Sequence, residues 1–450
     1  MIVQGLLPSM RSVRQITLCP LQRNWVFCLR TIHRSAIMWQ DKCEFEEFQS
    51  GHCSGTIEDV AKKIQRNIGV KPGYHTIPVC RSGLLKFQPK REDLPCRCIK
   101  DSFTTAVVPI SSLSKRERYI NHLARVRVGR LMEDLDLFAV WICHRYVKVP
   151  KLPRGVPLPY VFVTLLVDKV DFYNFNTVDA DVDIEFCGHV SWVGRSSMEI
   201  TIYMRQQQRN ITKTILMMVA RNATNTGSAP VNKLQPCNEA EQLCFDKAVK
   251  RQERRGRKAP ILRPSHNDEK LMFDIFRRTN GTDIVRDERI ELPENSAWMS
   301  QSFQTTLIHP FPDNRNSQNN IFGGYVMRNA VEISFMTASI YTQSRPFIEC
   351  IMDIAFLSPI KVHSFLKMTA HVVYTFEQFM QILTVVQVMD ANTFEEVTTN
   401  TFNITFRAEQ NVKEVLPSSY QETLWYINGR NKFQDFQQLK AKRNTKSLKV

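Results

Sequence analysis

The segment Asn319-Asn320-Ile321-Phe322-Gly323-Gly324 carries the most chemical information in this chain, and an apolar run with helical periodicity follows it over residues 325–341. Because glycine lacks a Cβ, a ligand can approach the backbone closely at such a point. The first N–H groups of a helix have no intrahelical acceptor, so this junction favours an anion or a developing oxyanion. A tight entry into an ordinary packed helix fits the same motif.

A degenerate copy of this pattern lies 195 residues earlier in the chain. When Gly129 is aligned with Gly324, apolar helical runs follow both glycines, over residues 135–143 and 330–340. An internal repeat at this distance indicates two copies of one domain rather than one large fold.

The two copies differ at the positions that could do chemistry. The first copy carries Asp136 seven residues after its glycine, where the second copy has Val331. Conversely, Arg125 stands in the first copy where the second has Asn320. Each copy therefore holds half of a site, and we expect one composite site between them.

Asp136 lies within a run that is apolar on nearly every side, which indicates a central helix surrounded by protein. A carboxylate in such surroundings has a specific partner or a raised pKa, and both conditions suit a general base or a nucleophile. A buried Asp satisfied by a local donor is the alternative. The preceding Glu133 and Asp134 are explained by the helix dipole. Glu332 is the rival in the second copy, but its register differs by one residue, about 100° around a helix, so we expect it to face elsewhere.

Short runs rich in β-branched and aromatic residues surround each helix and indicate strands. They are residues 160–167, 182–192, 198–204 and 214–220 in the first copy, and 299–308, 347–356, 364–375, 380–388 and 395–406 in the second. One long helix with several antiparallel strands predicts an α+β fold, formed twice, in which a curved antiparallel sheet wraps around a central helix.

At the level of families, residues 322–327 resemble the start of the central helix in hotdog-fold acyl-CoA thioesterases. The chain as a whole resembles the mitochondrial double-hotdog acyl-coenzyme A thioesterase 9/10 group. The runs that carry this resemblance are residues 128–136, 166–171, 188–194, 218–221 and 321–324, in the order found in that group. The resemblance covers roughly residues 95–430. It implies tandem hotdog domains.

The resemblance also implies a hydrolase that splits acyl-CoA into a free acid and coenzyme A at the seam between the two central helices. Carried onto this chain, Asp136 is the general base or the direct nucleophile. Asn320 would orient the water or the carbonyl, and the backbone N–H near Gly324 would stabilise the oxyanion. The expected substrate-binding residues complete the same loop: Asn319, Phe322 and Gly323.

The assignment of the asparagine and the function itself both leave alternatives open. The family places its asparagine at Asn319 or Asn320, and both positions are Asn here. Asn316 is the residue expected to brace the loop through local backbone hydrogen bonds. A non-catalytic acyl-CoA or acyl-carrier binding protein of the same fold is the first alternative function.

The net charge of +16 is concentrated in segments outside the two copies. Residues 1–40 contain five Arg and no Asp, Glu or Lys, which is typical of a mitochondrial transit peptide, and we expect the mature protein in the matrix. A second basic cluster, residues 247–258, is expected to be a solvated helix or loop. A basic mitochondrial RNA-associated protein is the second alternative, but no stacking aromatics interleave with this cluster, so we expect no nucleic-acid partner.

These observations divide the chain and limit its partners. The expected segments are a transit peptide at 1–38, an N-terminal extension at 39–100, a first hotdog domain at 101–235, a basic linker with a helical insert at 236–295, a second hotdog domain at 296–410 and a C-terminal tail at 411–450, whose basic end from Lys440 on is expected to be mobile. The twelve cysteines lack paired zinc-ligand spacing, so we expect free thiols, no metal and no cofactor. No run approaches the about 20 apolar residues of a membrane helix. The expected partners are the acyl-CoA substrate and further copies of the chain in a homo-oligomer.

Overall fold

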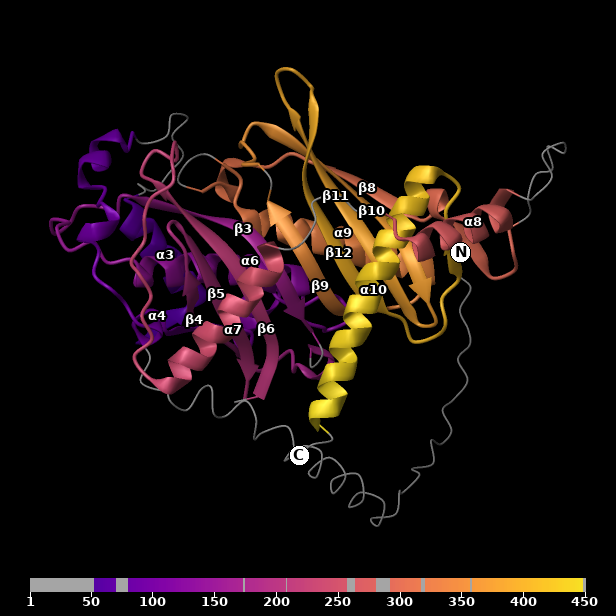
Figure 1. The fold of residues 1–450 in the computed structure, drawn as a ribbon, viewed down its shortest axis with the longest axis horizontal. Coiled ribbons are helices and arrows are strands. Elements are labelled where there is room, and N and C mark those ends of the chain that lie inside the picture. The colour runs from indigo at the N-terminus through magenta and orange to yellow at the C-terminus, as the bar shows by residue number, and fades with distance from the viewer. Residues whose placement is uncertain are drawn as a thin grey trace, which may run out of the picture.

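The chain has a mixed α and β architecture, seen here in a computed structural model. The structure describes residues 52–69, 80–172, 175–207, 209–256, 264–280, 292–316, 320–356 and 358–447. The expected transit peptide, residues 1–38, and Asn319 lie outside these ranges. Figure 1 shows the first repeat in indigo and magenta and the second in orange, lying side by side.

Each repeat contains one long central helix, α6 (Val128–Tyr146) in the first and α9 (Gly323–Thr342) in the second. Phe138 and Ile142 of α6 and Met327 of α9 are fully buried. The two helices pack against each other as well as against the sheet. An apolar surface on most sides requires such surroundings, and the prediction of two central helices is confirmed.

The strands form one large sheet to which both repeats contribute. In chain order they are β1 (His52–Thr56), β2 (Thr104–Val108), β3 (Tyr160–Asp171), β4 (Ile184–Val193), β5 (Ser197–Gln206), β6 (Arg209–Asn222), β8 (Phe303–Ile308), β9 (Phe347–Phe356), β10 (Ser364–Phe376), β11 (Phe379–Asp390) and β12 (Glu396–Arg407). A separate two-stranded sheet joins β7 (Ser296–Trp298) to β13 (Glu414–Leu416). The predicted strands are therefore present, with ends that differ by a few residues.

The strand order in the large sheet shows the repeat directly. It runs β1-β2-β4-β5-β6-β3-β9-β12-β11-β10-β8, and the two halves mirror each other about the β3–β9 pair. At this seam the strands are antiparallel, with Leu166 opposite Ala355 and Asp171 opposite Cys350. Among the described strands of the large sheet, only β1 lacks a counterpart. Pairing across β3 and β9 makes one continuous sheet, with the two central helices meeting at its middle.

Two glycines allow α6 and α9 to cross at close range. A Cβ on Gly324 would lie 2.8 Å from the carbonyl oxygen of Glu133, and a Cβ on Gly129 would lie 2.9 Å from that of Arg328. Glu133 and Arg328 each follow the glycine of their own helix by four residues. The contacts are thus reciprocal, in agreement with the alignment of Gly129 with Gly324.

The N-terminal extension covers the outer side of α6. Helix α3 (Ile57–Ile68) buries Val60 and Ile64 against the core and packs on α6. The indole N–H of Trp141 in α6 donates to Ser54 Oγ at 2.7 Å. Two short helices flank β2: α4 (Ile99–Ser102) and α5 (Leu113–Arg116). This extension, joined to β2 through β1, becomes part of the wall around the site.

The basic cluster in the linker lies mainly on α7 (Glu239–Gly256), and a second helix, α8 (His266–Asn280), follows it. The guanidinium groups of Arg251 and Arg255 bind the two carboxylate oxygens of Glu199 at 2.6 and 2.7 Å. Glu199 is fully buried on β5, so these two arginines neutralise an interior charge. The described part of the cluster is helical, one of the two expected forms, but two of its charges serve the interior instead of the solvent.

The C-terminal segment also differs from the expected mobile tail. Helix α10 (Tyr420–Ser447) packs across β10, β11 and β12 and buries Phe433 and Phe436. Figure 1 shows it in yellow across the near face of the second repeat. The lysines near the end of the helix suggested a solvated segment. The two phenylalanines, three residues apart, form the apolar stripe that packs the helix against the sheet. Among the described residues, no helix combines the length and apolarity that crossing a bilayer requires.

Candidate active site

Asp136 lies at the seam, where the two repeats supply its hydrogen bonds. Its side chain is buried on the third turn of α6. The backbone N–H of Gly324, at the start of α9, donates to Asp136 Oδ2 at 2.7 Å. The hydroxyl of Thr164 on β3 donates to Oδ1. The carboxylate of the first repeat and the glycine turn of the second are therefore in direct contact.

Burial controls the protonation of this carboxyl group. Removal from water raises the pKa of Asp136 to about 6, while the hydrogen bonds from Thr164 and Gly324 oppose the rise and the nearby charge of Glu133 adds to it. A carboxyl group with a pKa near 6 is ionised at neutral pH but is more basic than an ordinary Asp. The site therefore holds a carboxylate suited to accept a proton or to attack a carbonyl.

The loop before α9 is fixed by backbone hydrogen bonds. Ile321 N–H donates to the Ile360 carbonyl at 2.7 Å, and Phe322 N–H donates to the Asn314 carbonyl at 3.0 Å. Asn316 Oδ1 accepts the backbone N–H of Asn320 at 3.2 Å, the bracing role expected of that residue. These bonds hold residues 320–322 in front of Asp136.

A cavity of about 1140 Å³ lies in front of the carboxylate. Asp136, Asn320, Phe322 and Gly323 all line it, together with residues of α3, β3 and the loop before α9. Of the predicted site residues, these four share the cavity and Gly324 contacts Asp136 from behind. Asn319 lies outside the described residues.

The equivalent position in the second repeat has no carboxylate. Val331, aligned with Asp136, is buried. Arg125 lies over the ring of Phe347, 4.2 Å from its centroid. Glu332 forms an ion pair with Arg127 and does not line the cavity of Asp136, so it faces elsewhere as expected.

Asp134 is a second buried carboxyl group on α6, but it serves the structure. The phenol of Tyr119 donates to it at 2.8 Å, and Arg130 pairs with it at 3.0 Å. Burial raises its pKa to about 6 despite these partners. Glu133, expected to be explained by the helix dipole, instead binds Arg130 and, across the seam, Arg328. Both acids therefore have charged partners, whereas the described donors to Asp136, Gly324 N–H and the Thr164 hydroxyl, are neutral.

Thr164 is the site residue that sequence reasoning missed. It lies in the middle of the predicted strand, where a threonine is ordinary, and its role depends on β3 running beside α6. The short side chain places its hydroxyl on the carboxylate and also within 3.4 Å of Met218 Sδ. The local sequence holds no signal for this contact.

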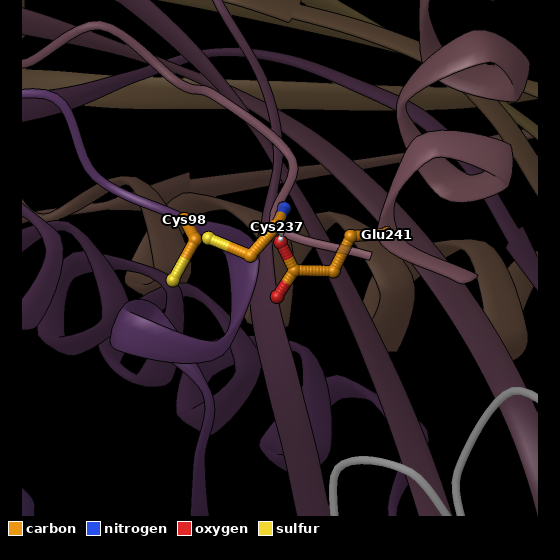
Figure 2. A group of neighbouring side chains, drawn as sticks. All are labelled: Cys98, Cys237 and Glu241. Atoms are coloured by element: carbon orange, nitrogen blue, oxygen red, sulfur yellow. Dashed lines mark hydrogen bonds between the residues drawn. The ribbon is translucent and has the colours of Figure 1, made fainter. Parts of the chain in front are cut away.

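Cys98, Cys237 and Glu241 form a separate polar cluster, whose thiol and carboxylate ligand atoms lie within 4.8 Å of one another (Figure 2). The Glu241 carboxylate is fully buried and accepts the backbone N–H groups of Ile99, Lys100 and Cys237, at 3.2, 2.9 and 2.9 Å. Glu241 therefore caps α4 and fastens the linker to it. We assign the cluster a structural role.

Comparison with known proteins identifies the family. Mitochondrial acyl-coenzyme A thioesterase 9 of Bos taurus is 34% identical over 352 residues, which cover 76% of this chain and 80% of the relative. Mitochondrial acyl-coenzyme A thioesterase 10 of Mus musculus is 32% identical over 391 residues, covering 84% of this chain and 88% of the relative. No protein-family model matches the chain. An acyl-CoA hydrolase structure from Staphylococcus aureus, in complex with butyryl coenzyme A, is 23% identical with a TM-score of 0.32, over 34% of this chain and 99% of that one.

A buried carboxylate of raised pKa, fixed by a helix N-terminus at the wall of a large cavity, has the chemistry of a hydrolase site. The sequence identity to the relatives, 34% and 32% over most of both chains, assigns this chain to one group of hydrolases. The chain belongs to the mitochondrial acyl-coenzyme A thioesterase 9/10 family. The family resemblance drawn from the sequence is thereby confirmed.

Proposed function

We propose that the chain hydrolyses acyl-CoA thioesters to free acid and coenzyme A at one composite site between two hotdog domains, residues 101–235 and 296–410. The observation that carries the proposal is the 2.7 Å hydrogen bond from Gly324 N–H of the second domain to Asp136 of the first. The names of the curated relatives support the substrate class. One carboxylate per chain gives one site, because Val331 replaces it in the other half.

In the mechanism that we favour, Asp136 acts on the thioester carbonyl in one of two ways. As a general base it takes a proton from water, which attacks the carbonyl carbon, and the tetrahedral intermediate then expels the thiolate of coenzyme A. As a nucleophile it attacks the carbonyl carbon, the C–S bond breaks and the thiolate of coenzyme A leaves, and water then hydrolyses the resulting mixed anhydride to the free acid and the Asp136 carboxylate. Gly324 N–H and the Thr164 hydroxyl hold the carboxylate in position for either route.

The groups that stabilise the oxyanion differ somewhat from the first expectation. In the structure Gly324 N–H donates to Asp136, so its direct part is to orient the carboxylate. We assign the oxyanion to the N–H of Gly323, which lines the cavity at the start of α9. The Asn320 side chain lines the same cavity and would orient the water or carbonyl. Asn320→Ala, with Asn316→Ala as the control for loop bracing, tests this role through kcat.

The function is tested by release of free thiol from acyl-CoA, measured with a thiol reagent across pH. Since ionised Asp136 is the active form and its pKa is about 6, we expect kcat to fall about tenfold per pH unit below 6 and to level off above it. A non-catalytic acyl-CoA binder would show saturable binding with no thiol release. An RNA-associated protein would instead bind nucleic acid with a steep salt dependence.

We further propose that the protein acts in the mitochondrial matrix as a symmetric homo-oligomer. The relatives are named mitochondrial, which supports the organelle. Leu307 on β8 and Met336 and Ile340 on α9 are exposed apolar side chains, and β8 ends the large sheet, so this surface suits a further copy. Native mass spectrometry of the chain from residue 39 measures the assembly, and a monomer at micromolar concentration would contradict this part of the proposal.

A further inference from the structure

The cavity that contains Asp136 continues into the first repeat, where its wall is basic. Arg66 of α3, Arg81 in the segment after it and Arg221 of β6 all line this part, which we call the basic wall. The acidic residues that line the described cavity are Glu133, Asp136 and Asp313. Glu133 is already bound to arginines of the two central helices, as shown above. The basic wall therefore gives this end of the cavity a positive potential.

Neutral groups hold two charges of the basic wall, those of Arg81 and Arg221. Arg81 is only 7% exposed, and its guanidinium donates to the Leu158 carbonyl at 2.6 Å. Arg221 donates to the side-chain and backbone oxygens of Asn225 at 2.9 and 3.0 Å. Within the described part of the chain, no ion pair joins either arginine to an acid. A buried guanidinium satisfied only by carbonyl oxygens keeps its full charge and favours an anionic ligand.

His144 supports this reading of the basic wall. It lies on α6, lines the same cavity and is 7% exposed. Burial, together with the charge of Arg81, lowers the pKa of His144 to about 3, so the ring is neutral. Neither ring nitrogen has a partner among the described residues. The neutral imidazole can therefore form a hydrogen bond with a ligand, but it adds no positive charge of its own.

We propose that the basic wall binds the phosphate groups of the coenzyme A portion of the substrate, an inference that rests on the thioesterase function proposed above. Asp136 and His144 are eight residues apart on α6, which places His144 about 12 Å along the helix from the reacting carboxylate. Arg81 of the basic wall lies close enough to His144 to lower its pKa, so the basic wall belongs to this far end of the helix. Coenzyme A carries its thioester at one end of a flexible arm and its phosphates at the other, which matches this separation. Most ligand pockets have volumes of about 300–1,000 Å³. The volume of this cavity is larger, as a substrate of the size of acyl-CoA requires.

The same assignment gives a direction to the acyl chain. If the phosphates lie against the first repeat, the acyl chain leaves the carbonyl toward the second repeat. That side of the cavity carries the apolar side chains of Phe322, Val326, Phe356 and Ile360, and the two charged residues that line it, Asp313 and Arg315, have opposite signs. Acyl-chain selectivity then depends on the second repeat, and coenzyme A recognition depends on the first.

Two substrates that share the acyl group but differ in the phosphates test this inference. The variants Arg66→Gln and Arg221→Gln are compared on an acyl-CoA and on the matching S-acylpantetheine, which lacks every phosphate. We expect the ratio of kcat/KM for acyl-CoA to that for S-acylpantetheine to fall about tenfold in each variant, the factor carried by one charge-assisted hydrogen bond. Most of the fall should come from a higher KM. An unchanged ratio in both variants would overturn the proposal.

Three controls distinguish loss of phosphate binding from other causes of a changed ratio. Arg209→Gln removes an arginine of β6 whose guanidinium donates to the Thr177 carbonyl away from the cavity, and it should leave the ratio unchanged. Turnover of S-acylpantetheine by the unaltered protein tests the catalytic proposal alone, so failure there is a different result. An acyl-CoA with a terminal carboxylate probes the other possible anion. If Arg221→Gln weakens only that substrate, the basic wall binds the acyl end and the phosphate assignment is wrong.

Discussion

Asp136→Asn should lower kcat for acyl-CoA hydrolysis by about 10²–10⁴-fold, the usual contribution of a positioned base. The fold should survive, because the new amide can accept Gly324 N–H through its oxygen and donate to Thr164 through its nitrogen. The carboxyl group has a folded pKa of about 6 against an ordinary 3.8, so it stabilises the protein less as pH rises between those values. At pH 7 we therefore expect the Tm of Asp136→Asn to equal or exceed that of the unaltered protein. Kinetics and thermal melts measure both effects.

Asp134 provides a matched control on the same helix. It is buried, has the same raised pKa, and lies two residues from Asp136, but its partners are Tyr119 and Arg130. Asp134→Asn should cost about 1–3 kcal/mol of stability by weakening these bonds, with kcat of the folded enzyme near normal. Near-normal kcat in Asp136→Asn, or an equal loss of kcat in both variants, would remove Asp136 from the mechanism.

Gly324→Ala is expected to produce the second large effect, on activity and stability together. The added Cβ would lie 2.8 Å from the Glu133 carbonyl oxygen and 2.9 Å from its Cα, which are backbone atoms of α6 that cannot turn away. The helices must separate, and the N–H that orients Asp136 moves with them. We expect a loss of about 1–3 kcal/mol from overpacking and a fall in kcat of roughly 10²-fold, typical of a displacement near 1 Å.

Two other glycines isolate the cause of this effect. Gly129→Ala creates the reciprocal clash, 2.9 Å from the Arg328 carbonyl oxygen, at the half of the crossing without the carboxylate. It should lose similar stability but less activity than Gly324→Ala. Gly83→Ala has no heavy atom within 4 Å of the new Cβ and should change neither quantity. If Gly129→Ala and Gly324→Ala reduce kcat equally, helix spacing alone explains the loss and Gly324 N–H has no separate role.

The amino-acid sequence by itself determined the features that depend on local periodicity and residue type. The alternation of apolar residues predicted the central helices and most strands, and the alignment of Gly129 with Gly324 identified the repeat. The same alignment placed Asp136 in one copy and the glycine turn in the other. The helix and strand predictions compare residues within a few turns or strands, where 3.6-residue and 2-residue periods are readable, and the alignment matches two such local patterns.

The remaining features depend on residues that are distant in the chain, and only the tertiary structure decided them. Pairing of β3 with β9 brings the halves together, so that Gly324 N–H meets Asp136 from 188 residues away and is committed to the carboxylate. Burial of Glu199 decides that Arg251 is an internal counterion rather than a solvated charge. Thr164 and the basic wall likewise acquire their roles from the elements packed beside them. Hydrogen bonds and desolvation act through space, and a one-dimensional pattern records the side chain available but not the partner that folding brings to it.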